Sequence, residues 1–524
     1  MTEILDFELS RRRLLEAAGL GGVALMAAPL LAVGAEPARA DAAKAPPVTG
    51  LHLQFGEDAS TQMVVSWISL EPVQNPRVLL GHLDGTPVVA AKAESATYTD
   101  AKSGRLVHVW HARLTKLSPN TSYMYAALHD GAEPEFGTFT TAPKGRARFT
   151  FTSFGDQGTP TLGRTQPAPP GAAPGAMSYT NDNLGSPFAA DTTLGVERLK
   201  PLFHLLNGDL CYANLAEDRI RTWWDFWANN SRSAKNRPWM PAPGNHENER
   251  GNGANGYQAY QTYFSLPHVA GQAEVMRGLW YAFTAGSVRV IALANDDVTY
   301  QDGGDSYVRG YSGGAQKAWL EKELAASRAN RGIDWIVVCM HQVAISTADK
   351  FNGADLGIRE EWLPLFDRYG VDLVVCGHEH HYERSHPLRG REENATLTPR
   401  PSATATDVID TSAGTVHMVI GGGGTSIPSH QLFFDPPRCR VITRVGEPGA
   451  SGKRPPVYVT EDAPWSAVRN AARAYGFAQF AVDPGKGPGS LTTITVTYYD
   501  VMGRDGQVAP FETFVLRRPR RDGA

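Results

Sequence analysis

Short apolar runs that end close to a glycine or a histidine recur along the chain from residue 146 onward. Each is typical of a buried strand, and the clearest ones span residues 149–154, 203–206, 335–339, 373–376 and 416–420. Apolar residues at helical spacing lie between them, over residues 196–202, 316–326 and 358–369. Strands that alternate with helices predict a layered α/β domain, and residues 477–516 return to a strand pattern.

The region before residue 146 has the pattern of an all-β domain. Residues 63–68, 107–112 and 136–139 are short strands rich in β-branched and aromatic residues. The segment Leu117–Tyr123 is typical of a tyrosine corner, in which the phenol bonds to the backbone. We therefore predict a fibronectin type III-like sandwich over residues 48–143, followed by the α/β domain over residues 146–520. Another kind of small β-sandwich is the alternative.

The N-terminus carries an export pattern. The sequence SRRRLL, from Ser10 to Leu15, resembles a bacterial twin-arginine signal, and a weakly apolar stretch and the small-x-small site Ala38-Arg39-Ala40 follow it. We expect residues 1–40 to be a signal peptide that the twin-arginine export machinery recognises, so that the protein is secreted or held in the bacterial cell envelope. An uncleaved anchor is the alternative, but the stretch is weakly hydrophobic. No later segment is apolar and long enough to predict a stable membrane span after cleavage.

Composition narrows the class of protein. A chain of 524 residues exceeds one ordinary domain, and its net charge of −4 does not favour nucleic-acid binding. Of the four cysteines, Cys211, Cys339 and Cys376 lie inside apolar runs, which is typical of buried free thiols. Twin-arginine systems export folded proteins, so a chain that folds in the reducing cytoplasm needs no disulfide framework.

Residues of metal-ligand type follow the predicted strands one after another. Because sites in open α/β sheets form beyond the carboxyl ends of the strands, we expect these residues to converge. The candidate ligands are Asp156, Asp209, Tyr212, Asn245, His341, His378 and His380. Any one motif alone is more typical of a turn or of a histidine with a hydrogen-bond partner. Five motifs in this order favour a metal site.

The candidate set is too large for one ion. A zinc ion takes four ligands, whereas seven residues suit two metals about 3.5–4 Å apart that share a carboxylate. The phenol of Tyr212 has a free pKa near 10, so its binding as phenolate requires a highly charged, hard cation, which indicates Fe³⁺. A site with an amide and two imidazoles suits Zn²⁺, Fe²⁺ or Mn²⁺.

The order GDQG, GDLCY, GNHE, CMH and GHEHHYER, between residues 149 and 419, resembles the purple acid phosphatases, a family of calcineurin-like metallophosphoesterases. The resemblance implies a β-sandwich flanked by helices. It also implies two sets of ligands that share the bridging Asp209: Asp156, Tyr212 and His380 for the ferric ion, and Asn245, His341 and His378 for the divalent ion. His246 would contact the phosphate and protonate the leaving group. His381 occupies a position that the family leaves free, so we expect it beside the ligands or at the surface.

These features predict an exported acid phosphatase that hydrolyses small phosphate monoesters by a metal-activated hydroxide. A metal centre lowers the pKa of its bound water and neutralises the phosphoryl oxygens, while His246 is suited to donate a proton. A phosphodiesterase with the same centre is the nearest alternative. A secreted binding protein without catalysis is a third, although such domains usually lose ligands.

The sequence departs from the family in the segment that follows His341. Plant-type members place substrate-binding histidines about ten residues further on, where this chain reads Asp349-Lys350-Phe351-Asn352. Asn352, Asp355 and Arg359 are the polar candidates for substrate contact there. Two Pro/Gly-rich stretches, residues 159–191 and 431–464, are either disordered or form a rim over the site.

Overall fold

The structure, a computed structural model, describes residues 10–16, 45–160, 164–167, 177–180, 184–450 and 452–523. The first domain is all-β, as predicted, with strands in the order β1-β2-β5-β4-β3-β6-β7. These strands are β1 (Thr49–Phe55), β2 (Met63–Ser69), β3 (Arg77–His82), β4 (Pro87–Thr99), β5 (Leu106–Leu114), β6 (Ser122–Leu128) and β7 (Glu135–Thr140). The hydroxyl of Tyr123 accepts a hydrogen bond from the backbone N–H of Ser118 at 2.9 Å, which is the contact of the predicted tyrosine corner.

Two seven-stranded sheets form the layered second domain. The first has the order β12-β11-β8-β26-β27-β28-β21 and the second β13-β14-β15-β17-β22-β18-β25. The first consists of β8 (Phe149–Phe154), β11 (Phe203–Asn207), β12 (Trp239–Ala242), β21 (Val408–Asp410), β26 (Gly476–Asp483), β27 (Leu491–Gly503) and β28 (Gln507–Pro519). The second consists of β13 (Tyr281–Ala285), β14 (Val288–Ala292), β15 (Trp335–Cys339), β17 (Leu373–Cys376), β18 (Tyr382–Ser385), β22 (Val416–Ile420) and β25 (Ser466–Arg469).

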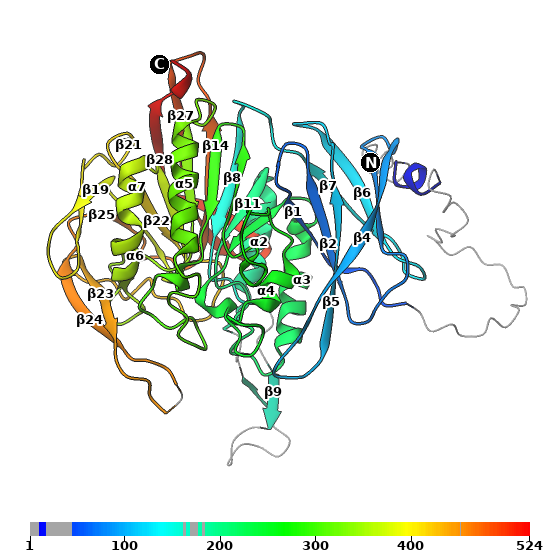
Figure 1. Ribbon diagram of the computed structural model, residues 1–524, viewed down its shortest axis with the longest axis horizontal. Helices are drawn as coiled ribbons and strands as arrows, with labels where there is room; N and C mark the ends of the chain where they lie inside the picture. The colour runs from blue at the N-terminus through cyan, green and yellow to red at the C-terminus, as the bar shows by residue number, and fades with distance from the viewer. Residues whose placement is uncertain are drawn as a thin grey trace, which may run out of the picture.

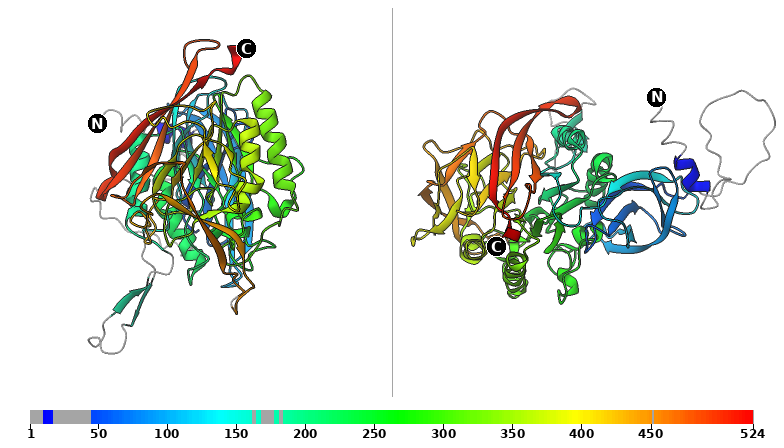
Figure 2. Two further views of the ribbon diagram at one scale, coloured as in Figure 1. Left: turned by 90° about the vertical axis from the view of Figure 1, so that its left-hand side faces the viewer. Right: turned by 90° about the horizontal axis from the view of Figure 1, so that it is seen from above.

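Helices cover the outer faces of the two sheets, so the predicted layered architecture is confirmed (Figure 1). Seen from the side, the green helices α5 and α7 lie toward one side of the domain, and the red strands β27 and β28 of the first sheet lie toward the other (Figure 2). The helices are α2 (Phe188–Leu199), α3 (Arg219–Ala234), α4 (Gln258–Tyr263), α5 (Ala315–Ala329), α6 (Leu356–Glu361) and α7 (Leu363–Tyr369). The helical pattern of residues 358–369 is split at Trp362, because Pro364 follows in the first turn of α7 and cannot donate to the preceding turn.

Both Pro/Gly-rich stretches contain regular secondary structure. Helix α2 begins at Phe188, inside the first stretch, which also contains the paired strands β9 (Arg164–Pro167) and β10 (Met177–Thr180). The second stretch forms a hairpin of β23 (Arg438–Val445) and β24 (Pro456–Asp462), which continues from β16 (Ala354–Asp355) in a small sheet. The hairpin therefore supports the rim interpretation rather than disorder. A short pair, β19 (Leu388–Arg391) and β20 (Pro399–Pro401), completes the described strands.

Of the predicted signal, only residues 10–16 lie in the described part of the chain, where they are helical. Leu14 is buried there against Leu79 and Met124 of the β-domain. The remaining residues of the predicted signal, including the cleavage site, lie outside the described residues. In the part of the chain that the structure covers, no helix is long and apolar enough to cross a membrane. All four cysteines are buried and free, including the three for which the sequence predicts this.

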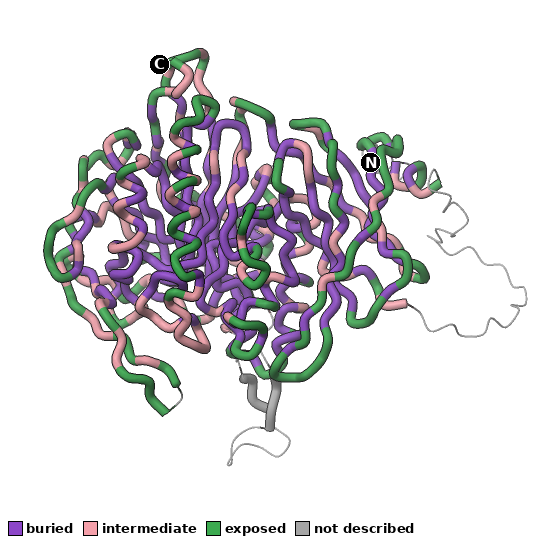
Figure 3. Tube along the Cα trace, in the orientation of Figure 1, coloured by how far each residue is buried: buried purple, intermediate pink, exposed green. Residues whose placement is uncertain are grey.

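One hydrophobic core runs through both domains (Figure 3). At the junction, the imidazole of His52 on β1 stacks on Trp227 of α3, with ring centroids 3.7 Å apart. The Nε2 atom of His52 lies 2.8 Å from the carbonyl oxygen of Tyr263. Because the ring is buried between the domains, the pKa of His52 falls to about 4. The junction thus contains a histidine that stays neutral in the folded state.

This burial predicts a pH-dependent stability. Between pH 6.5 and 4 the unfolded chain binds a proton at His52 and the folded chain does not, so the free energy of unfolding falls as the pH falls through this window. We expect a His52→Gln variant to lose about 2 kcal/mol less than the wild type between pH 7 and pH 5, measured by urea unfolding. The exposed His82, changed to Gln, serves as the control. Equal losses in wild type and His52→Gln would contradict the assignment.

Candidate metal centre

The predicted ligands lie just beyond the carboxyl ends of strands from both sheets. Asp156 and Asp209 follow β8 and β11 of the first sheet, and His341 and His378 follow β15 and β17 of the second. These strands run parallel within their sheets, so their carboxyl ends lie along one edge of each sheet, and side chains from both edges line one cavity. This cavity has a volume of about 690 Å³, and its walls include Asp209, Tyr212, Asn245, His246, His378 and His380.

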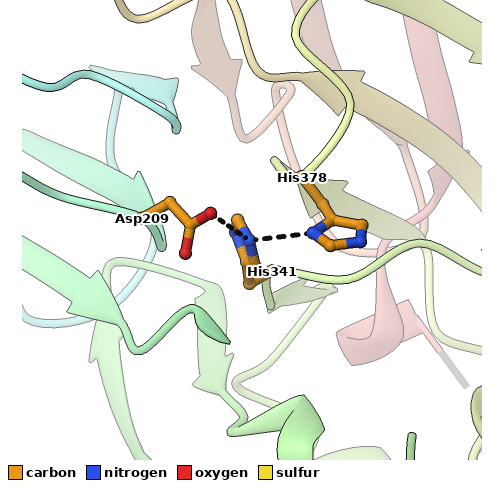
Figure 4. Close-up of side chains that lie close together, drawn as sticks. All are labelled: Asp209, His341 and His378. Atoms are coloured by element: carbon orange, nitrogen blue, oxygen red, sulfur yellow. Dashed lines mark hydrogen bonds and ion pairs between the residues drawn. The ribbon is translucent and has the colours of Figure 1, made fainter. Parts of the chain in front are cut away.

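One group of side chains gathers around His341. Its Nε2 atom lies 3.0 Å from Oδ2 of Asp209, 3.0 Å from Oδ1 of Asn245 and 3.2 Å from Nδ1 of His378. Figure 4 shows the two histidines and Asp209 pointing toward one another. Two donor atoms that each lie about 2.1 Å from one ion are themselves about 3 Å apart, so this spacing fits a shared cation.

A second group lies beside the first and contains the tyrosine. The hydroxyl oxygen of Tyr212 lies 3.3 Å from Oδ1 of Asp156 and 3.1 Å from Nε2 of His380. The same His380 nitrogen lies 3.3 Å from Oδ1 of Asp156. The structure therefore separates His378 and His380 into different groups, in the same division that the sequence predicts.

Each of the three histidines has its other ring nitrogen bonded to an oxygen acceptor. Nδ1 of His341 lies 2.7 Å from the carbonyl oxygen of Asn207, and Nδ1 of His380 lies 2.6 Å from that of Ile427. His378 is held in the opposite sense, since its Nε2 lies 2.7 Å from Oε1 of Gln301. An N–H bonded in this way fixes the tautomer and aims the other nitrogen's lone pair at the centre, as metal-binding histidines require.

The pKa values of the side chains in the site also fit a bound cation. Burial and the carboxylates of Asp156 and Asp209 raise the pKa of Tyr212 well above its usual range. Burial alone would lower the pKa of His341, but the same two carboxylates raise it to about 10. Buried anionic groups thus recruit protons here, and a highly charged cation would replace those protons on binding. The donor set, its spacing and its electrostatics all fit a metal centre.

Glycines before the ligands allow the loops to meet. A Cβ atom on Gly244 would lie 2.3 Å from the backbone nitrogen of Asp209, and one on Gly377 would lie 2.3 Å from Oδ2 of Asp156. Neither contact is possible for real atoms, so these positions require glycine. Four non-glycine residues adopt the left-handed conformation that brings their side chains into the centre: Asp156, Asp209, Tyr212 and His378.

Three residues of the site were not identified from the sequence. The carboxylate of Glu247, in the 3₁₀ helix η1 (Asn245–Glu247), accepts hydrogen bonds from the backbone N–H groups of Asp209, Leu210 and Gly244. Glu247 therefore joins two ligand loops. Its position at the end of the GNHE motif is the signal that was available. The others are Gln301, described above, and Asn214.

Asn214 holds the predicted general acid. Its Oδ1 atom lies 2.8 Å from Nδ1 of His246. His246 lies on the cavity wall, and its Nε2 atom is 3.9 Å from Oδ2 of Asp209. Asn214 follows Tyr212 by two residues, so the extension of the GDLCY motif to GDLCYAN contains it. Its contact with His246 comes from a distant loop and has no local signal.

Of the three residues predicted to contact substrate, one lies on the cavity wall and two are buried elsewhere. Asn352 lies on the cavity wall, where its amide donates to the carbonyl oxygen of His378 at 2.5 Å. Asp355 is instead buried as the N-cap of α6, and it accepts from the backbone of Gly357 and Tyr300. Arg359 is buried as well, bonded to the carbonyl oxygen of Ala344 and to Glu461. The expectation that these two residues contact substrate is corrected, because other contacts occupy their polar groups away from the cavity.

His381 is also away from the surface. It is fully buried, with Nδ1 2.8 Å from Oγ of Ser429 and Nε2 3.0 Å from Oε1 of Glu383. Glu383 in turn accepts from the backbone N–H and the hydroxyl of Thr347. The surface alternative for His381 is therefore wrong, and the residue supports the loop that carries the ligands.

Comparisons with known proteins agree with this architecture. Residues 48–152 match the family model for the N-terminal domain of purple acid phosphatases, and residues 185–382 match the calcineurin-like phosphoesterases. An uncharacterised protein of Mycobacterium tuberculosis is 60% identical over 477 residues, or 91% of this chain and 88% of that protein. A purple acid phosphatase of Glycine max is 26% identical over 387 residues, or 72% of each chain. The structure of a purple acid phosphatase from yellow lupin seeds has a TM-score of 0.64 at 22% identity, covering 91% of this chain and 75% of that one.

The two groups of donors predict two metal ions per chain. We expect metal analysis of the purified protein to find two equivalents, and an Asp209→Ala variant to hold fewer than one, because the sequence predicts that Asp209 bridges the two ions. Metal removal should lower the melting temperature, since binding to the folded state alone stabilises it. An Asn352→Ala variant, changed on the same cavity wall, should keep two equivalents. Full metal content in Asp209→Ala would contradict the shared role of Asp209.

Proposed function

The chain belongs to the purple acid phosphatases, a family of binuclear metallophosphatases within the calcineurin-like phosphoesterases, and we propose that it is an exported enzyme that hydrolyses small phosphate monoesters. The observation that carries the proposal is the pairing of two donor groups with His246 on the wall of one cavity. In hydrolysis a water oxygen forms a bond to phosphorus, the bond from phosphorus to the leaving oxygen breaks, and that oxygen gains a proton. The site has residues suited to each part.

We assign the ligands as two sets that share Asp209. Asp156, Tyr212 and His380 would hold Fe³⁺, because only a hard, highly charged cation displaces the proton from a phenol whose pKa is raised. Asn245, His341 and His378 would hold Zn²⁺, Fe²⁺ or Mn²⁺. When bound, the metal pair supplies an activated water and neutralises the charge of the phosphoryl group.

His246 is the proposed proton donor. Asn214 accepts from its Nδ1–H, so the ring can carry its second proton on Nε2, which faces the cavity. From there a proton passes to the leaving oxygen as the phosphorus–oxygen bond breaks. Asn352 is the remaining candidate for contact with the phosphate, since it lies on the same wall.

The cavity supports a small substrate. Its volume of about 690 Å³ suits a small molecule, and its rim combines the apolar Leu184, Phe351 and Ile427 with the basic Lys453 and Arg454. Such a rim accepts an organic leaving group and attracts an anion. A phosphodiester carries a second organic group, which the cavity would also have to accommodate. Phosphodiesterase activity is the alternative function.

The export proposal depends on two features. The SRRRLL segment resembles a twin-arginine signal, and the chain has four buried free cysteines and so needs no oxidising compartment to fold. Both suit a protein that takes up its metals in the cytoplasm before the twin-arginine machinery moves it to the cell envelope or the medium.

Activity assays test the proposed reaction. We expect hydrolysis of 4-nitrophenyl phosphate to exceed that of bis(4-nitrophenyl) phosphate at equal concentration. On phenyl phosphate, whose leaving oxygen must gain a proton, a His246→Ala variant should lose about 10²–10⁴-fold in kcat, the usual contribution of a general acid, while it keeps its two metals. Faster cleavage of the diester would favour the alternative. Unchanged kcat in His246→Ala would remove this residue from the reaction.

Visible spectroscopy tests the ferric assignment separately. We expect purified protein to be coloured by a charge-transfer band between the Tyr212 phenolate and Fe³⁺. The Tyr212→Phe variant should lose this band, because phenylalanine has no oxygen donor. Tyr475, whose hydroxyl donates to the carbonyl oxygen of Thr425, provides a matched Tyr→Phe control that keeps the band. A colourless wild-type protein that contains only zinc or manganese would overturn the assignment.

A further inference from the structure

The turn between β4 and β5 of the N-terminal domain inserts into the loops behind the metal centre. The backbone N–H of Ala101 donates to Oδ1 of Asn252 at 2.8 Å, and Nζ of Lys102 donates to the carbonyl oxygen of Ala216 at 2.7 Å. A Cβ atom on Gly251 would lie 2.6 Å from that of Ala101, so the two backbones are in close contact. The N-terminal domain therefore contacts both the loop after Tyr212 and the loop after η1.

A buried arginine lies at the centre of this contact. Arg219, the first residue of α3, is only 6% exposed and is surrounded by three carboxylates. Its guanidinium nitrogens lie 3.8 Å from Asp100 of the N-terminal domain, 3.9 Å from Glu249 and 3.3 Å from Asp305. A buried cation is tolerated only where charges surround it in this way, and its planar guanidinium orients them.

From Arg219 the contacts continue to the proton donor. Oδ2 of Asp305 accepts a hydrogen bond from Nη2 of Arg219. Oδ1 of the same carboxylate accepts one from Nδ2 of Asn214 at 3.3 Å. An amide side chain has a donor end and an acceptor end. Because the NH₂ group of Asn214 donates to Asp305, its oxygen Oδ1 faces Nδ1 of His246, at 2.8 Å.

We propose that the N-terminal domain positions the general acid of the reaction through the connected residues Asp100, Arg219, Asp305, Asn214 and His246. The four residues before His246 are positioning residues and do not touch substrate. If the amide of Asn214 turned round, its NH₂ group would oppose the N–H on Nδ1 of the protonated ring. The contacts prevent that rotation and so keep His246 able to donate from Nε2. The inference rests on the proposed phosphatase function.

The chemistry supplies a readout that a purely structural role would not change. A proton must reach the leaving oxygen when that oxygen is a poor leaving group, as in phenyl phosphate. It matters far less for 4-nitrophenyl phosphate, whose leaving anion is stabilised by its nitro group. Loss of general-acid positioning therefore acts on the first substrate much more than on the second.

The experiment compares kcat for these two substrates in the full-length, metal-loaded protein. We expect Asp305→Ala to lose about tenfold on phenyl phosphate and less than about threefold on 4-nitrophenyl phosphate, with two metals retained. Asp100→Asn removes the charge that faces Arg219 from the N-terminal domain, and it should shift the ratio in the same direction by a smaller factor. Melting temperatures identify any variant that is merely unfolded.

A matched control lies in the same domain. Asp58 accepts from the N–H and hydroxyl of Ser60, as Asp100 does from Ser103, but makes no contact with Arg219. Asp58→Asn should leave the substrate ratio unchanged. Equal losses on both substrates in Asp305→Ala would overturn the proposal. If the ratio of kcat on the two substrates changed in Asp305→Ala but not in a folded Asp100→Asn variant, the role proposed for the N-terminal domain would be overturned. If the wild type hydrolysed neither ester, the proposed function itself would fail.

Discussion

Close approach of five loops, which follow strands of two sheets, is the constraint on which the centre depends. The ligands come from two sheets, and their loops must meet at distances where a single Cβ atom would collide with a neighbouring backbone or carboxylate. Glycine removes the collision at Gly244 and Gly377, and left-handed backbones at Asp209 and His378 turn the side chains inward. The carboxylate of Glu247 then satisfies three N–H groups that this crowding would leave without partners.

The same constraint explains why the sequence predicts much of the site. A ligand beside a glycine at the end of an apolar strand is a local pattern, so β8 and β17 have the predicted bounds and the ligand residues gather as expected. Partners that reach the site from another segment leave no such pattern. Gln301, for example, contacts His378 from a loop far away in the chain.

Nearness in sequence was misleading for the residues after His341. Asp355 and Arg359 follow closely, but the start of α6 turns them into buried contacts with neighbouring segments. Asn352, a few residues earlier, does reach the cavity. The β23–β24 hairpin shows a different limit, since its Pro/Gly-rich composition left disorder and an ordered rim as equal alternatives. A Pro/Gly-rich composition indicates that a segment contains turns. Whether the segment forms an ordered rim depends on the sheet with which it pairs.

Strand order has a consequence for synthesis of the chain on the ribosome. β8, which begins the second domain, pairs on one side with β11 and on the other with β26, which starts at Gly476. Until that late segment emerges, one edge of β8 lacks its partner, and an unpaired edge is a template for association with other chains. A message truncated near its end would therefore yield a chain with every ligand present and a sheet open at its centre. Quality control of such a product would depend on its exposed strand edge rather than on its metal site.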